Sequence, residues 1–261
     1  MSYPTRPVAQ PDVPIALSIA GSDPTGGAGF QLDLRVFTRL GAHGMAVPTA
    51  LIAQTTEKVV RVLPAFPSVV GEQLNVLLAD IVPDVIKIGM LATDDVLLHV
   101  ANVLERYAVP RVVDPVLRAS DGTLLLERRA WGSLLQRVIA GAALVTPNLP
   151  EAEALTGHAE PEAAARDLLD CGAQAVLVKG GHAEGAPDDL LVTAEASVWL
   201  RGERAGTEPV RGTGCALSSA IAVHLARGTA LEEAVREAKH FVQEAIASAI
   251  SPGRGAALLH I

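Results

Sequence analysis

Two glycines and a cysteine precede a long apolar segment near the end of the chain, in the order Gly212, Thr213, Gly214 and Cys215. A glycine loop that leads into a helix leaves backbone N–H groups free at the positive helix end, and such groups bind anions. The segment therefore predicts a site that stabilises charge on a transferring phosphoryl group. The alternative is an ordinary glycine-capped loop. The Cys215 thiol at the helix start favours a functional site.

The sequence leaves two roles open for Cys215. It is either a base that acts on a substrate hydroxyl or a hydrogen-bonding group that positions this hydroxyl. A free thiol has a pKa of about 8.5, so half-ionisation at pH 7 requires a shift worth about 2 kcal/mol. A helix N-terminus usually supplies about 0.3–1 kcal/mol, and bound phosphates oppose ionisation. Both roles stay open. The other cysteine, Cys171, is expected to be a packing residue.

Oxygen ligands lie three residues apart at an expected strand-to-helix junction, in Asn148 and Glu151. Such ligands suit Mg²⁺, which proteins usually bind through its waters and the phosphates of a nucleotide. A helix cap with an acid in the first turn is the alternative. Asp114, before Pro115, is either a further charge for this metal or a turn former. Lys179, before two glycines, offers a cation near phosphates.

These residues follow short apolar runs that alternate with helical patterns. We expect strands over 15–20, 59–63, 85–88, 111–114, 143–146, 175–179, 190–193 and 197–200. We expect helices over 31–40, 69–80, 94–107, 160–171, 214–227 and 231–250. This alternation predicts one three-layer αβα domain, a mostly parallel central sheet flanked by helices, over 14–261 after a flexible tail at 1–13. Ligands of such folds lie beyond the carboxyl ends of the strands, where the polar and glycine-rich segments fall.

Composition narrows the class of protein. The 261 residues include 21 Lys and Arg against 29 Asp and Glu, for a net charge of −8, and only 3% aromatic residues. We therefore expect no nucleic-acid partner and no binding to an anionic membrane. The proline-rich start has no apolar signal region, and no apolar stretch is long enough to span a bilayer. Together with two cysteines, this predicts a cytoplasmic protein.

Six motifs lie in order along the chain: AGSDPTGGAG at 20–29, KIGML at 87–91, DPV at 114–116, TPNLPEA at 146–152, VKGGH at 178–182 and GTGC at 212–215. Together they resemble the ribokinase-like superfamily, and within it the hydroxymethylpyrimidine/phosphomethylpyrimidine kinases of thiamine biosynthesis. The resemblance implies phosphorylation of 4-amino-5-hydroxymethyl-2-methylpyrimidine with ATP and Mg²⁺. It also implies a second transfer to the monophosphate, which gives the pyrophosphate. Because family members are commonly dimers, a homodimer is expected.

The resemblance also implies a set of site residues. The pyrimidine pocket would contain Gly21, Asp33, Gln54, Met90 and Val116, with Gln54 hydrogen-bonded to the amino-pyrimidine edge. Gly212, Thr213, Gly214 and Cys215 would form the anion hole, and Cys215 stands where many members of the superfamily carry a catalytic Asp. Asp114, Asn148 and Glu151 would serve the metal and the phosphates, and Lys179 would lie near the nucleotide.

The chain departs from the family pattern near these residues. Arg211 stands where His is usual, Gln54 is followed by Thr-Thr where Asn-Thr is common, and 117–121 read LRASD where MVAKS is common. These segments bear on substrate recognition and closure.

Three other functions remain as alternatives. The main one is a pyridoxal or pyridoxamine kinase of the same superfamily, because its substrate is also a heteroaromatic ring with a hydroxymethyl group. A transferase or hydrolase with Cys215 as nucleophile would need a partner base that the neighbouring sequence does not supply. A catalytically silent nucleotide-binding module would have no need of Asn148, Glu151 and Cys215.

Overall fold

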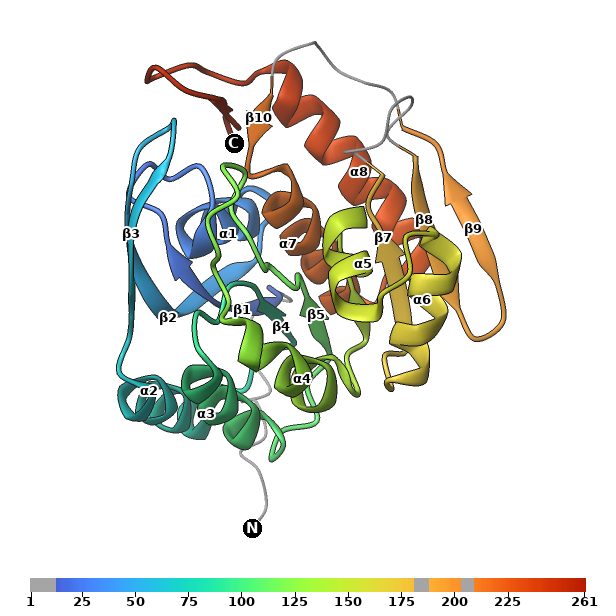
Figure 1. Ribbon diagram of the computed structural model, residues 1–261, viewed down its shortest axis with the longest axis horizontal. Helices are drawn as coiled ribbons and strands as arrows, with labels where there is room; N and C mark the ends of the chain where they lie inside the picture. The colour runs from blue at the N-terminus through green and yellow to red at the C-terminus, as the bar shows by residue number, and fades with distance from the viewer. Residues whose placement is uncertain (1–12, 181–187, 203–208) are drawn as a thin grey trace.

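The computed structural model describes residues 13–180, 188–202 and 209–261, so the expected tail at 1–13 lies almost wholly outside the described residues. A nine-stranded sheet forms the centre, in the order β3-β2-β1-β4-β5-β6-β7-β8-β9 (Figure 1). The strands from β2 to β7 in this order run parallel, and β3, β8 and β9 are antiparallel to their neighbours. The predicted sheet type is confirmed.

The strands of this sheet are mostly short, but β2 has 12 residues. They are β1 (Ile15–Ser22), β2 (His43–Gln54), β3 (Val59–Pro64), β4 (Val85–Ile88), β5 (Arg111–Val113), β6 (Leu144–Val145), β7 (Ala175–Val178), β8 (Asp189–Thr193) and β9 (Ser197–Leu200). Two further strands, β10 (Val210–Arg211) and β11 (Ala257–Leu258), pair with each other. This pairing places the chain's last residues beside the segment that enters the last pair of helices.

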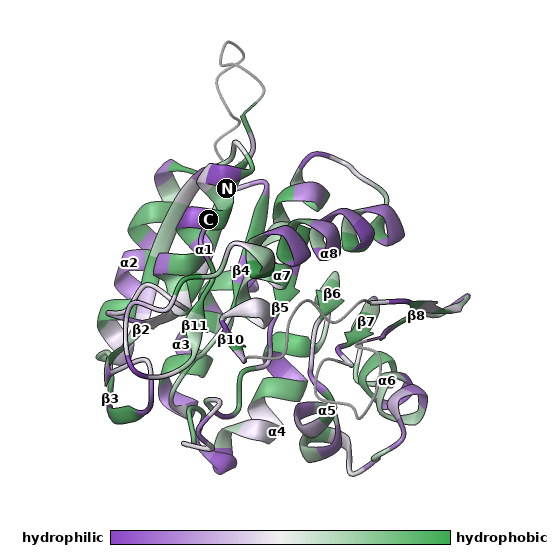
Figure 2. Ribbon diagram, turned by 90° about the horizontal axis from the view of Figure 1, so that it is seen from above, coloured by the Kyte–Doolittle hydropathy of each residue, from purple (hydrophilic) through white to green (hydrophobic). Residues whose placement is uncertain are grey.

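Helices cover both faces of the sheet, which completes the predicted three layers (Figures 1 and 2). One face is covered by α1 (Gly29–Arg39), α7 (Thr213–Ala226) and α8 (Leu231–Ala247). The other is covered by α2 (Pro67–Asp80), α3 (Asp94–Leu104), α5 (Leu149–Thr156), α6 (Pro161–Asp170) and the 128–139 segment with η1 (Arg128–Ala130), α4 (Trp131–Ser133) and η2 (Leu134–Ile139). Each layer buries its own apolar core against the sheet.

Several elements were not predicted from the sequence, among them β2, the 128–139 segment and the pair β10 and β11. The strand β2 contains Gly44 and Pro48, which are residues that weaken a strand pattern. It forms nonetheless, because β1 pairs with it in parallel on one side and β3 pairs in antiparallel on the other. The 128–139 segment departs from α-helical geometry into 3₁₀ and π turns, so its apolar spacing does not follow a single helical period.

No helix among the described residues has the length and hydrophobicity that a membrane crossing needs.

Candidate active site

The loop before α7 has the geometry that the glycines predict. Gly212 is the N-cap of α7 in a left-handed conformation, with φ of 87°. A Cβ atom at Gly212 would lie 2.0 Å from the backbone oxygen of Gly27, so only glycine fits at this position. The first backbone hydrogen bond of the helix runs from Ala216 N to Gly212 O at 2.9 Å. The N–H groups of Thr213, Gly214 and Cys215 therefore have no partner within the helix, as an anion site requires.

An ion pair lies against the first turn of α7. Lys179, directly after β7, contacts Asp114, directly after β5, with 2.8 Å between Nζ and Oδ1. A Cβ atom at Gly214 would lie 3.0 Å from Lys179 Nζ, so the ammonium group lies beside the helix N-terminus. Burial would raise the pKa of Asp114, but Lys179 and Lys87 hold it below its ordinary value. Burial lowers the pKa of Lys179, but Asp114 and Glu151 raise it above its ordinary value. The Lys179 ammonium group therefore stays charged beside the N–H groups at the start of α7.

Cys215 lies half-buried in the first turn of α7, and its side chain is close enough to Asp114 to help lower the pKa of that carboxyl. Burial raises the pKa of the Cys215 thiol to about 12, although Lys87 favours its ionisation. The acidic neighbours Asp114 and Asp33 act in the same direction as burial. At neutral pH the side chain is therefore a thiol, which donates one hydrogen bond and whose sulfur can accept another.

The start of α5 is a capping box. Asn148 N donates to Glu151 Oε2 at 2.9 Å, and Glu151 N donates to Asn148 Oδ1 at 2.8 Å. The capping alternative for this pair is thus confirmed. Burial raises the pKa of Glu151 to about 7; Lys179 opposes this rise and Asp114 adds to it. Glu151 and Asp114 are therefore close enough to interact as charges.

A divalent cation would find limited protein ligands here. Within 13–180, 188–202 and 209–261, no three His, Cys, Asp or Glu side chains are grouped as a metal site. The Asn148 amide oxygen is engaged in the cap, and the Asp114 carboxylate is paired with Lys179. Two neighbouring carboxylates, Asp114 and Glu151, fit Mg²⁺, because Mg²⁺ keeps several waters and takes its other ligands from phosphates.

Three residues expected in a ring pocket lie together. A Cβ atom at Gly21 would lie 2.9 Å from Met90 Sδ and 3.4 Å from Ile52 Cδ1. Met90 and Val116 belong to one small apolar cluster, which Ile52 also joins. Thr49 Oγ1 donates to Met90 O at 2.5 Å and so fixes the backbone there. Gly21, Met90, Val116 and Ile52 thus form a small apolar group; sequence reasoning missed Ile52 because its strand was not predicted.

Gln54 ends β2 on the same side as this apolar group. Residues alternate across a strand, so Ala50, Ile52 and Gln54 share one face. The pairing of β2 with β3 contains a bulge, and its extra residue, Val60, belongs to β3. The side chains of β2 therefore keep alternating between its two faces as far as Gln54. Gln54 Oε1 accepts a hydrogen bond from Arg211 Nη2 at 2.6 Å. The sequence marks Arg211 as a departure but does not reveal this contact.

Asp33 forms a buried ion pair. It lies on α1 with no exposed surface and is paired with Lys87 of β4, with 2.9 Å between Oδ2 and Nζ. Ser18 Oγ donates to Oδ2 at 2.6 Å, and Ser219 Oγ donates to Oδ1 at 2.8 Å. Both oxygens are engaged, so Asp33 joins α1, β1, β4 and α7, and its place at the pyrimidine pocket stays a prediction. Neither Lys87 nor Ser219 was among the predicted site residues.

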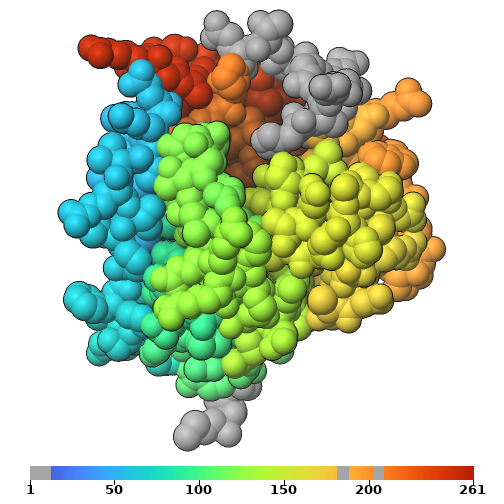
Figure 3. Space-filling view, in the orientation of Figure 1, coloured from blue at the N-terminus to red at the C-terminus, as the bar shows by residue number. Residues whose placement is uncertain are grey.

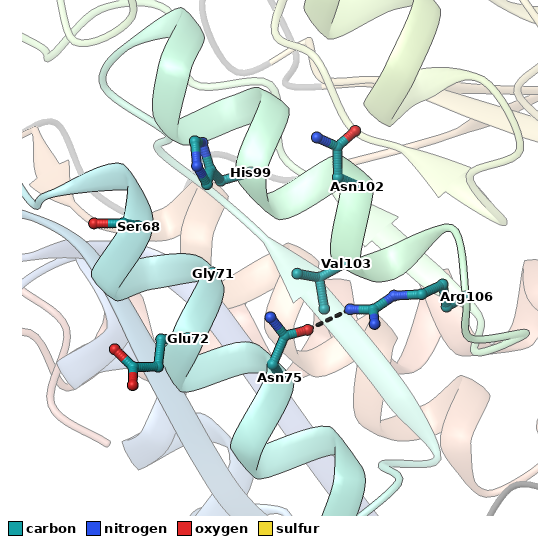
Figure 4. Close-up of a pocket in the computed structure, with 8 residues that line it drawn as sticks. All are labelled: Ser68, Gly71, Glu72, Asn75, His99, Asn102, Val103 and Arg106. Atoms are coloured by element: carbon teal, nitrogen blue, oxygen red, sulfur yellow. Dashed lines mark hydrogen bonds between the residues drawn. The ribbon is translucent and has the colours of Figure 1, made fainter.

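The surface agrees with this placement of the site. In Figure 3, α7 (brown) is seen at depth between the light-green segment after β5 and the yellow α5. A separate groove lies between α2 and α3, where Arg106 donates a hydrogen bond to Asn75 (Figure 4). It is lined by Ser68, Gly71, Glu72, Asn75, His99, Asn102, Val103 and Arg106. None of these residues was predicted to do chemistry.

Similarity to known proteins covers almost the whole chain. The family model for phosphomethylpyrimidine kinase matches residues 23–260. A hydroxymethylpyrimidine/phosphomethylpyrimidine kinase of Salmonella typhimurium is 43% identical over 255 residues, which are 94% of this chain and 96% of the relative. The Rhizobium meliloti protein of the same name is 42% identical over 252 residues, 92% of this chain and 95% of the relative.

Solved structures give the same family and a neighbouring one. A phosphomethylpyrimidine kinase from Clostridium difficile aligns with a TM-score of 0.80 and 36% identity, over 89% of this chain and 99% of that chain. A pyridoxal kinase from Staphylococcus aureus in complex with ADP aligns with a TM-score of 0.87 and 31% identity, over 95% of this chain and 93% of that chain. By the family model and the identity over nearly its full length, the chain belongs to the phosphomethylpyrimidine kinase family, a family of phosphotransferases.

Proposed function

We propose that this kinase transfers the γ-phosphoryl group of ATP to the hydroxymethyl group of 4-amino-5-hydroxymethyl-2-methylpyrimidine, and then a second phosphoryl group to the monophosphate. The Rhizobium and Salmonella relatives are named hydroxymethylpyrimidine/phosphomethylpyrimidine kinases, which supports both steps. A Geobacter sulfurreducens relative, 42% identical over 92% of this chain, is named a thiamine biosynthesis bifunctional protein, which supports the pathway. The use of ATP is supported by complexes of the Staphylococcus aureus pyridoxal kinase with ADP and AMP-PCP.

The observation that carries the proposal is the position of Lys179 beside the open N-terminus of α7. Phosphoryl transfer proceeds through a loose transition state, so positioning and neutralisation of charge supply most of the rate. The N–H groups of Thr213 and Gly214, with the Lys179 ammonium, would hold the oxygens of the transferring group. Asp114 and Glu151 would hold Mg²⁺ through its waters and the nucleotide phosphates, and the ion would neutralise further phosphate charge.

Cys215 would orient the substrate hydroxyl and would not deprotonate it. Its thiol lies close to Asp114, and the sulfur can accept a hydrogen bond from the substrate hydroxyl. The hydroxyl oxygen forms the new P–O bond as the bond to ADP breaks. The hydroxyl proton can leave on the product phosphate, because a loose transition state needs little deprotonation of the nucleophile. This choice between the two open roles follows from the pKa of about 12.

A pyridoxal kinase is the second candidate, and a specific observation favours it. Pyridoxal kinase structures, one of them with pyridoxal bound, align with TM-scores of 0.84–0.87 at 30–32% identity. The pyrimidine remains the preferred substrate of the proposal, because relatives named for it reach 42–43% identity.

Exposed apolar side chains on β2, β3 and α2 support the proposed homodimer. They are Leu51, Val60, Leu63, Phe66, Val69 and Val76, and Phe66 is 78% exposed. Light scattering should give a dimer mass for the wild type and a monomer mass for Phe66→Glu. A wild-type monomer would contradict the homodimer. We also propose that residues 14–261 form a single domain in a cytoplasmic protein, in keeping with the one sheet that joins β1 to β9.

Product analysis tests the proposed reaction. The purified protein is incubated with Mg·ATP and the hydroxymethylpyrimidine, and products are followed by mass. The monophosphate should form first and the pyrophosphate second, whereas Glu151→Gln and Lys179→Met should lower both rates. Absence of both products, with pyridoxal phosphorylated under the same conditions, would overturn the pyrimidine in favour of the second candidate.

A further inference from the structure

Arg211 joins the two halves of the site described above. It forms part of β10 and directly precedes Gly212, which begins the anion loop. Its side chain extends to the end of β2, where Nη2 donates to Gln54 Oε1 at 2.6 Å and Nη1 donates to Thr55 O at 2.9 Å. One guanidinium group therefore forms hydrogen bonds with both the Gln54 side chain and the Thr55 backbone at the end of this strand.

The contact with Arg211 determines which way the Gln54 amide points. A guanidinium group has only N–H donors, so it accepts no hydrogen bond from an amide NH₂. The flipped amide would place donors against donors beside a positive charge. Oε1 must face Arg211, and Nε2 must point elsewhere. Among the described parts of the chain, no hydrogen-bond acceptor is in place for Nε2, so its two hydrogens are available.

Arg211 is itself held by its surroundings. The carboxylate of Asp121, in the segment after β5, attracts Arg211 electrostatically. The same carboxylate is fixed by a hydrogen bond from Val59 N at 2.7 Å, at the start of β3. A planar guanidinium that is held on several sides gives a fixed direction to its hydrogen bonds.

We propose that Arg211 is a specificity-determining positioning residue that sets the Gln54 amide to donate from Nε2 to an acceptor atom on the edge of a heteroaromatic substrate. The proposal deepens the proposed function and rests on it, because Gln54 shares the face of β2 that borders the Gly21–Met90 group. In this arrangement Arg211 does not touch the ring, and it acts on ring binding only through its hydrogen bond to Gln54. It should therefore affect ring binding and leave nucleotide binding unchanged.

A double-mutant cycle tests this inference. The KM for the ring substrate and the KM for ATP are measured for the wild type, Arg211→Met, Gln54→Leu and the double variant. Arg211→Met should raise the ring KM about tenfold, equivalent to about 1.4 kcal/mol, and leave the ATP KM within about twofold. In the Gln54→Leu background the same change should add less than about twofold, since the two side chains act as one unit. Arg211→Lys retains a donor and should fall between the wild type and Arg211→Met.

Arg166→Met is the matched control. Arg166 is an exposed arginine of α6 that also donates to a backbone oxygen, Thr193 O at 3.2 Å, and to a side chain, Ser197 Oγ at 3.0 Å. This variant should have the KM values of the wild type. Equal rises in both KM values for Arg211→Met, or a full tenfold further rise in the Gln54→Leu background, would overturn the proposal.

The proposed function and the inference fail in different ways. If the wild type phosphorylates pyridoxal and not the pyrimidine, the proposed substrate is wrong. The cycle is then measured with pyridoxal, whose ring edge also carries acceptor atoms, and the same coupling between Arg211 and Gln54 is expected. Absence of coupling with the ring that the enzyme does phosphorylate contradicts the inference alone.

Discussion

Replacement of Gly212 by alanine should impair catalysis as well as stability. Gly212 has a φ of 87°, and alanine in the left-handed region costs about 1–2 kcal/mol. The new Cβ would also lie 2.0 Å from Gly27 O, a backbone atom that no side-chain rotation can move away. Two separate effects, strain and collision, therefore act at this position.

The size of the catalytic effect follows from the collision. A Cβ atom essentially never approaches another heavy atom within 3.0 Å, so the two segments must separate by at least 3.0 − 2.0 = 1.0 Å. The displaced atoms begin the turn that presents the N–H groups of Thr213 and Gly214. A misplacement of about 1 Å at a catalytic site costs on the order of 100-fold in rate. We expect kcat to fall by about this factor.

Gly228→Ala separates strain from collision. Gly228 follows the other end of α7, has a φ of 78°, and has no atom within 4 Å of a built Cβ. Gly228→Ala should lose about 1–2 kcal/mol of unfolding free energy in urea titrations, and Gly212→Ala should lose more, because the collision adds to the strain. Only Gly212→Ala should lose about 100-fold in kcat at saturating substrates. A folded Gly212→Ala enzyme with wild-type kcat, or an equal loss in Gly228→Ala, would refute the reasoning.

Three further predictions concern ionisable groups. Cys215→Ser should keep kcat within about tenfold of the wild type, and the two enzymes should have the same pH dependence between pH 7 and 9, because the thiol pKa of about 12 keeps Cys215 protonated. A rise in rate with pH that the serine variant lacks would show that Cys215 acts as a base. Burial raises the pKa of Glu151 from 4.5 to about 7, so the unfolding free energy of the enzyme without nucleotide should fall as pH rises through this window. Glu151→Gln should remove that slope in urea titrations, and an unchanged slope would assign it to other groups. Asp33→Asn should lower the unfolding free energy by about 3–5 kcal/mol, because it leaves Lys87 charged and fully buried. Glu232→Gln, in the exposed pair with Arg236, should lower it by about 0.5 kcal/mol or less. Equal losses in the two variants would show that the buried pair contributes no more to stability than the exposed one.

The sheet and the anion loop were predictable because their signals are local. Apolar runs such as Val85–Ile88 match their strand to the residue. Gly212 is the N-cap of α7 in a left-handed conformation, which favours glycine through local backbone geometry alone. The strand-to-helix alternation then places Asp114 and Lys179 at one sheet edge, and the structure joins them at 2.8 Å.

The remaining features depend on contacts between distant parts of the chain. β2 forms through its neighbours on both sides, despite Pro48. Arg211 reaches Gln54 across 157 positions, and Ser219 reaches Asp33 across 186, so no window of sequence contains either pair. The resemblance alone implied a place for Asp33 in the pyrimidine pocket, and its buried partner Lys87 lies inside an apolar strand. A buried lysine in such a strand is the signal that could have indicated a paired acid.

A competition experiment tests the central claim most directly. Equal concentrations of the hydroxymethylpyrimidine and pyridoxal are mixed with the wild-type enzyme and limiting Mg·ATP, and the phosphorylated products are counted by mass. The account predicts pyrimidine phosphates in at least about tenfold excess, a preference of about 1.4 kcal/mol in the transition state. A mixture dominated by pyridoxal phosphate would contradict it.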